Sequence, residues 1–122
     1  MNKNRLNRVN SLLRQVIFEV IQKEVRNPHV TTFVSVTRVD TSSDLHHAKV
    51  YISLIGDNVE KTKVLSALQS AAGFIAVQAA SQVNLRYFPN LIFKMDHSAE
   101  EHAKMQKLLD DIEKERLSRP SS

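Results

Sequence analysis

Hydrophobic residues in the first part of the chain recur every three or four positions, which is the period of an amphipathic helix. They are Leu6, Val9, Leu13, Val16, Ile17, Val20, Ile21 and Val25. We expect the helix to end by Asn27-Pro28, because proline disfavours helical geometry in the residue before it. The basic residues within it outnumber Glu19 and Glu24, so the helix is expected to be basic. They are Arg5, Arg8, Arg14, Lys23 and Arg26.

Two runs rich in β-branched residues follow at 33–39 and 48–55, and a polar cluster at 40–44 separates them. This arrangement predicts an antiparallel hairpin. Apolar and polar residues alternate in the second run, so one face is expected to be buried and the other to meet water. The residues predicted to be buried are Ala48, Val50, Ile52 and Leu54, and those predicted to meet more water are Lys49, Tyr51 and Ser53.

A second helical stretch extends from Asp57 or Asn58, either of which can cap it, to about Asn84. It passes through Gly73, although a glycine inside a helix costs on the order of 1 kcal/mol relative to alanine. One explanation is close packing of the glycine against the sheet. The other is a bend that divides the segment into two helices, the second of which would offer free backbone N–H groups to a phosphate.

A third strand is predicted at 91–95, and Ser98-Ala99-Glu100-Glu101 resembles a capping box that opens a last helix. Its apolar side is Met105, Leu108, Leu109 and Ile112. The order αββααβ predicts an α+β fold of the KH type, a three-stranded sheet covered by helices on one face, plus a C-terminal accessory helix. We expect residues 1–97 to form a KH-like RNA-binding domain. Residues 98–122 are expected to be a helix and a frayed polar tail of the same domain.

Charge is distributed unevenly along the chain, whose net charge is +4. Residues 1–94 hold twelve Lys/Arg against six Asp/Glu, whereas residues 95–122 hold five against seven. A basic body attracts polyanions such as nucleic acid. The chain has no cysteine, which excludes disulfides and thiolate metal sites. Because we find neither a long apolar run nor a secretory signal, we expect a cytoplasmic location and no membrane contact.

Two histidine-containing clusters could suggest catalysis or metal binding. His46 and His47 are neighbours in a predicted strand and should point to opposite faces. Asp96-His97-Ser98 are adjacent in sequence, whereas catalytic triads assemble from distant segments. With only two glycines, the chain holds no phosphate-binding loop. We therefore predict no catalytic residue, no metal site and no cofactor, with a metal-dependent hydrolase using Asp44, His46 and Asp96 as an alternative.

The element order favours RNA binding, although the usual KH clamp is absent. KH domains hold nucleotides with a Gly-X-X-Gly loop, and this chain offers only Ala71-Ala72-Gly73 there. We therefore expect basic side chains to contact the phosphates of structured RNA. A protein–protein adaptor, whose acidic last helix docks a partner, is the alternative from another class.

Several motifs together resemble the ribosome-binding factor A family over roughly residues 5–109. The matching segments are Val34–Val39, Ser43-Asp44-Leu45, Ala48–Ser53, Ala71–Ile75, and Leu85-Arg86 with Pro89, Leu91, Phe93, Asp96 and Ser98. The resemblance implies a type II KH-like protein that binds free 30S small ribosomal subunits. It further implies help in late maturation of 16S rRNA, including 5′-end processing, support of growth in the cold, and release involving a ribosome-associated GTPase. We expect a monomer.

Three positions depart from the family pattern. The chain has Ala76 where the family often has arginine, Asn27-Pro28-His29 in place of Asp-Pro-Arg, and His102 in place of glycine. The first two changes remove positive charge near the expected RNA face, so other basic residues are expected to carry more of the contact. The predicted RNA-binding residues are Arg5, Arg8, Arg14, Lys61, Lys63 and Arg86, then Lys49 and Lys94, with Ala71 and Gly73 at the helix bend.

Overall fold

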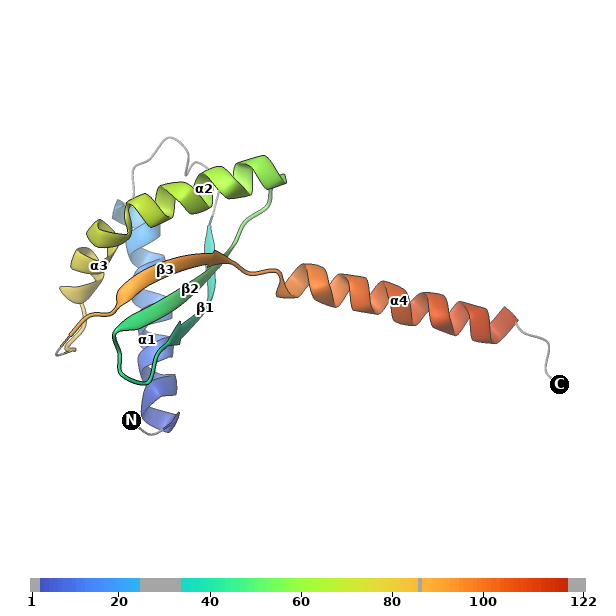
Figure 1. Ribbon diagram of the computed structural model, residues 1–122, viewed down its shortest axis with the longest axis horizontal. Helices are drawn as coiled ribbons and strands as arrows, with labels where there is room; N and C mark the ends of the chain where they lie inside the picture. Colours follow the sequence, from blue (N-terminus) through green and yellow to red (C-terminus); the bar gives the residue numbers. More distant parts are fainter. Residues whose placement is uncertain (1–2, 25–33, 86, 119–122) are drawn as a thin grey trace.

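The computed structural model describes residues 3–24, 34–85 and 87–118 (Figure 1). Its element order confirms the predicted α+β fold. The elements are α1 (Lys3–Glu24), β1 (Ser35–Thr41), β2 (His47–Ser53), α2 (Asn58–Ser70), α3 (Ala72–Ala80), β3 (Asn90–Met95) and α4 (Ser98–Ser118). The predicted helix end at Asn27-Pro28 lies outside the described residues.

The three strands form one sheet in the order β1-β2-β3. β1 and β2 pair antiparallel, which confirms the hairpin, and β3 runs parallel to β2. A β-bulge interrupts the register of β1 between Val36 and Arg38. A bulge inserts one extra residue into a strand, so the alternation of inward and outward side chains changes phase there.

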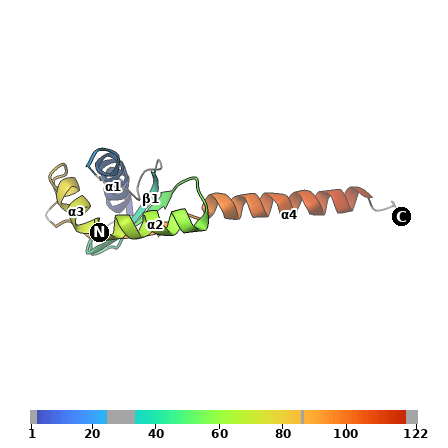
Figure 2. The same ribbon diagram turned by 90° about the horizontal axis from the view of Figure 1, so that it is seen from above.

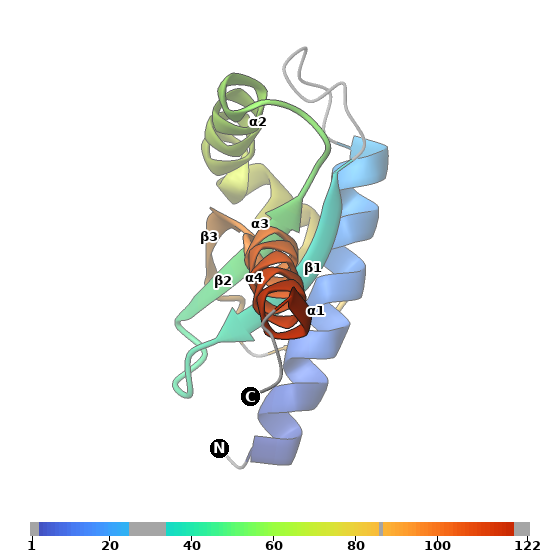
Figure 3. The same ribbon diagram turned by 90° about the vertical axis from the view of Figure 1, so that its right-hand side faces the viewer.

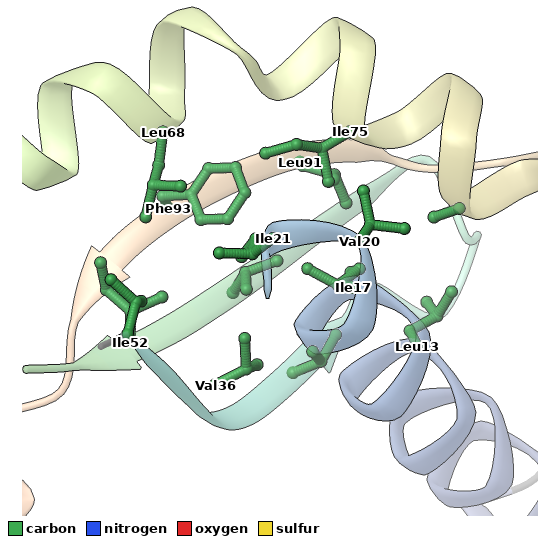
Figure 4. Packing of buried hydrophobic residues seen from close by; sticks show 14 of the residues in the cluster. Leu13, Ile17, Val20, Ile21, Val36, Ile52, Leu68, Ile75, Leu91 and Phe93 are labelled. Atoms are coloured by element: carbon green, nitrogen blue, oxygen red, sulfur yellow. The ribbon is translucent and has the colours of Figure 1, made fainter. Parts of the chain in front are cut away.

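The hydrophobic core lies between one face of the sheet and three helices (Figure 4). Buried residues of α1, α2 and α3 meet the inward side chains of all three strands. Those that are at most 4% exposed include Leu13, Ile17, Val20, Leu68, Ile75, Val50, Ile52 and Phe93. The four residues predicted to be buried in the second strand run are buried, which confirms the one-sided pattern. None of the described helices covers the opposite face of the sheet, which we call the open face, and the strands lie in front of α1 in Figure 1.

Side-chain amides cover backbone groups at both edges of the sheet. At the β3 edge, the Gln69 amide of α2 donates to the Leu91 carbonyl (3.2 Å) and accepts from the Phe93 N–H (2.9 Å). At the β1 edge, the Asn10 side-chain oxygen accepts from the Thr41 N–H (2.9 Å). Because an uncovered edge can pair with another chain, these amides limit where a further strand could add.

The predicted helix bend is real, but it lies at Ala71 and not at Gly73. Asp57 caps α2 as predicted, by accepting from the Glu60 N–H (2.8 Å). Ala71 leaves helical geometry (φ −90°, ψ 4°), and α3 starts at the next residue. A Cβ added to Gly73 would meet nothing within 4 Å. The explanation by close packing of Gly73 is therefore wrong.

Helix α4 projects away from the body (Figures 1 and 2), and none of its residues is buried. Figure 3 looks along α4, which lies in front of the body in that view. The helix begins at Ser98, as predicted. The hydrogen bond at this end is not that of a capping box, because the Ser98 N–H donates to the Asp96 carboxylate (2.8 Å). The predicted apolar side, Met105, Leu108, Leu109 and Ile112, is about half exposed throughout.

Candidate nucleic-acid interface

A polar groove of about 480 Å³ lies between α1 and β1. Its α1 wall is formed by residues spaced three and four apart, which places them on one side of the helix. The lining residues are Asn7, Asn10, Ser11, Arg14, Thr37, Arg38, Val39 and Asp40. Amide, hydroxyl and guanidinium donors therefore converge here, and such groups bind phosphate and sugar oxygens of nucleic acids.

The open face of the sheet carries three cations in adjacent strands. Across the sheet, Arg38 is paired with Tyr51, and Tyr51 with Lys94. The guanidinium of Arg38 lies over the Tyr51 ring, 4.2 Å from its centroid. In the next row Lys49 stands between Asp40 and Ile92. Positive charge on this face therefore exceeds negative charge, and the cations lie around the ring of Tyr51.

Arg38 lines the groove and also lies on the open face beside Tyr51. The sequence analysis did not identify Arg38 as a site residue. Strict alternation from Val34 and Val36 would place Arg38 inside the core. The bulge instead exposes both Thr37 and Arg38 and turns Val39 inward. A bulge has no strong sequence signal in this strand, so only the structure places Arg38 beside Tyr51. Asn7 and Asn10 also escaped the sequence analysis, which followed charges and not amides.

Asp96 follows β3 directly and lies next to the open face. Its carboxylate accepts a short hydrogen bond from the Thr37 hydroxyl (2.5 Å) and one from the Ser98 N–H (2.8 Å). Hydrogen bonds from Ser98 and Thr37, together with the nearby positive charge of Arg38, lower the pKa of Asp96 to about 2. The carboxylate therefore stays charged at neutral pH and fixes the connection between β3 and α4.

The predicted basic residues of α1 do not share one surface. Arg5 and Arg14 are nine residues apart, about two and a half helical turns, so they lie on opposite sides of the helix. Arg14 lines the groove, whereas Arg5 and the exposed Arg8 belong to the other half of the helix surface. The structure thus places Arg14 in the groove, which adjoins the open face at Arg38, and leaves Arg5 and Arg8 outside the groove.

The predicted residues of α2 and the bend form a separate region. The Lys61 ammonium pairs with the Glu100 carboxylate of α4 (2.7 Å), and its side chain is only 20% exposed. That ammonium lowers the pKa of Glu100. Lys63 is exposed. At the bend α3 has no side-chain cap, and Gly73 in its first turn is exposed. Arg86 lies outside the described residues.

The alternative metal site is excluded by its geometry. The Asn90 N–H donates to the His46 carbonyl, and the Asp96 N–H donates to the Ile52 carbonyl. The length of β3, about 20 Å, therefore separates His46 from Asp96. Asp44 instead holds the hairpin turn, where it accepts from the Ser42 hydroxyl (2.6 Å) and the His46 N–H (3.0 Å).

Among the described helices, none is long and apolar enough to cross a membrane.

Comparisons of this sequence with known proteins all give the same family. A family model described as ribosome-binding factor A matches residues 5–109. The ribosome-binding factor A of Protochlamydia amoebophila is 55% identical over 115 residues, which cover 94% of this chain and 88% of that protein. The chain belongs to the ribosome-binding factor A family. The same-named protein of Clostridium novyi is 37% identical, covering 95% of this chain and 96% of its own.

Solved structures of this family share the fold. The crystal structure of ribosome-binding factor A from Thermus thermophilus has a TM-score of 0.68 at 22% identity, covering 76% of this chain and 97% of its own. A homology model of the Thermus thermophilus protein, fitted into the cryo-EM map of a 30S–RbfA complex, has a TM-score of 0.61 at 24% identity. It covers 72% of this chain and 91% of its own.

The family match includes the groove, the open face and the bend, and it ends at Leu109, inside α4. Among the departures from the ribosome-binding factor A pattern, Ala76 is partly buried and packs against the core. His102 is exposed on α4, and His29 lies outside the described residues. The groove and the open face hold the best-defined cluster of cations in the described part of the chain.

Proposed function

We propose that this protein binds 16S rRNA within free 30S ribosomal subunits, in the cytoplasm, and assists late rRNA maturation, including 5′-end processing. The observation that carries this proposal is the continuous surface formed by Arg14, Arg38, Lys49 and Lys94 on a KH-like body. Membership of the ribosome-binding factor A family and the 30S complex of the Thermus thermophilus relative support it.

Binding is proposed to depend mainly on phosphate contacts, because the surface offers guanidinium, ammonium and amide donors. The protein acts as a monomer that supports growth in the cold and leaves the subunit with the help of a ribosome-associated GTPase. Its role is not enzymatic.

Co-sedimentation with purified small subunits, large subunits and assembled ribosomes tests the proposal. We expect selective pelleting with small subunits that weakens as salt rises, since phosphate contacts release counterions. Arg14→Glu and Arg8→Glu make the same change at two positions about 120° apart around α1, one inside the groove and one outside it. Arg14→Glu should weaken binding more and reduce the salt slope by about one or more. Equal binding to every particle, or no binding, would refute the proposal.

A second candidate function is an adaptor that docks a protein through α4. The exposed apolar side of this helix favours it, because Met105, Leu108, Leu109 and Ile112 form a continuous stripe in which no residue is buried. Deleting residues 98–122 separates the two functions. An rRNA binder keeps most of its affinity for small subunits after the deletion, whereas an adaptor loses its partner.

A further inference from the structure

The open face of the sheet holds one tyrosine side chain flanked by cations. Tyr51 lies in the central strand, between Arg38 of β1 and Lys94 of β3. Helices α1, α2 and α3 pack on the other face, and α4 points away (Figures 1 and 3). In the described part of the chain no helix covers this face, on which Arg38, Lys49 and Lys94 are exposed and Tyr51 is partly exposed.

We propose that this face binds an unpaired nucleotide of RNA by stacking its base on the Arg38–Tyr51 pair. The inference rests on the proposed function and specifies the part of the RNA that is recognised. The Arg38 guanidinium lies over the ring, 4.2 Å from the centroid, so one side of the guanidinium faces Tyr51. Arg38 is exposed, so its other side is open to a ligand. Unpaired bases stack on guanidinium planes and on aromatic rings in RNA-binding proteins.

The charges around the pair suit the phosphates that flank a stacked base. Lys94 is directly across from Tyr51, and Lys49 stands one row away in the same strand as Tyr51. Residues two apart on a strand point to the same face and are about 7 Å apart, which is close to the spacing of successive phosphates in an extended strand. The opposing charges are Asp40, which is paired in register with Lys49, and Asp96, which borders Arg38.

An unpaired strand fits this face better than a duplex does. In a duplex the bases are stacked inside and present no free aromatic plane, so a planar Arg–Tyr pair would add nothing beyond charge. The bulge holds Arg38 on the open face and against the ring, because a regular strand would direct this side chain into the core. A lysine at the same position would supply the same charge without the planar group.

Tyrosine fluorescence provides a direct test, because the chain has no tryptophan and two tyrosines, Tyr51 and Tyr87. Tyr87→Phe leaves Tyr51 as the only emitter. A short unpaired RNA oligonucleotide should quench its emission to saturation, and the same strand in a perfect duplex should not. Unpaired RNA that binds and leaves the emission unchanged would overturn the proposal.

Matched variants separate stacking from charge. Arg38→Lys and Tyr51→Leu should each weaken binding of the unpaired oligonucleotide roughly five- to hundredfold, the range for loss of one stacked base. Both keep the net charge, so the salt slope should stay as in the parent protein. The control is Arg116→Lys, the same exchange on exposed α4. Wild-type affinity in both Arg38→Lys and Tyr51→Leu would show that charge alone holds the RNA and would overturn the proposal.

The same variants in the small-subunit assay distinguish this inference from the proposed function. Small-subunit binding by the parent protein, with no effect of either Arg38→Lys or Tyr51→Leu on oligonucleotide affinity, would overturn the stacking proposal and leave the proposed function standing. Loss of small-subunit selectivity in the parent protein would refute the proposed function, and the oligonucleotide titration would still decide whether the Arg38–Tyr51 pair stacks a base.

Discussion

Replacing Gln69 by alanine should destabilise the protein measurably although the residue is exposed. The Gln69 amide acts as the missing neighbour of edge strand β3, since it donates to the Leu91 carbonyl and accepts from the Phe93 N–H. A net contribution of about 0.5–1.5 kcal/mol per hydrogen bond gives about 1–3 kcal/mol. Water reaches the edge after the substitution and recovers part of this, so we expect a loss of about 1–2 kcal/mol.

Urea unfolding followed by circular dichroism measures this loss, which corresponds to a fall in melting temperature of roughly 4–8 °C. Gln106→Ala is the matched control, because Gln106 is an exposed helical glutamine that bonds only to Asp110 one turn away. It should change stability by less than about 0.5 kcal/mol. Gln69→Glu keeps the acceptor and loses the donor, so it should also destabilise. Equal stability of Gln69→Ala and Gln106→Ala would refute the role of the amide.

Two further predictions concern the junction with α4. The pKa of Asp96 is about 2 in the folded protein and near 3.8 when unfolded, so its contribution is present above about pH 4 and is lost as the pH falls towards 2. Asp96→Asn should reduce the pH dependence of the urea midpoint across that range. Thr37→Val should reduce this pH dependence in part. Deleting residues 98–122 should lower the urea midpoint of the body only slightly, because no residue of α4 is buried and the deletion removes the Ser98 and Glu100 contacts alone; a large fall would show that α4 packs on the body.

The element order could be predicted because each segment has a clear hydrophobic period and a recognisable boundary. Asp57 supplied a helix start that the structure confirms, and alternation in β2 correctly assigned the buried face. The predicted limits of the first strand, 33–39, differ by two residues from those of β1, and the bulge within β1 left no pattern in the sequence. The end of α3 at Ala80 was also missed, since the apolar period continues to Val83 after the backbone has left the helix.

The candidate site was harder to predict, because charge alone does not show which side of an element a residue occupies. Arg14 and Arg5 look equivalent in the sequence, yet only Arg14 faces the groove. Lys61 looks like a free cation, yet it pairs with Glu100, a residue 39 positions away. The apolar side of α4 could not show whether this helix covers the sheet, and the structure leaves that side exposed. Each of these outcomes depends on tertiary geometry and not on local pattern.

Gly73→Ala offers a test of why a glycine occupies the first turn of α3. A Cβ there meets nothing within 4 Å, and alanine favours the helix, so the variant should be more stable by about 0.5–1 kcal/mol. The chain's other glycine provides the contrast. A Cβ at Gly56 would approach the Glu60 carboxylate to 2.5 Å, so Gly56→Ala should bring no such gain.

A residue that lowers stability without packing or turn geometry to require it points to a ligand that approaches the backbone. Gly73 is exposed beside first-turn N–H groups that no side chain caps. If RNA approaches there, the added methyl should weaken small-subunit binding while it raises the melting temperature. Thermal unfolding and co-sedimentation of the same preparation measure both effects. A more stable variant with unchanged binding would show that RNA does not approach the backbone at Gly73, and the groove with the open face would then carry the contact alone.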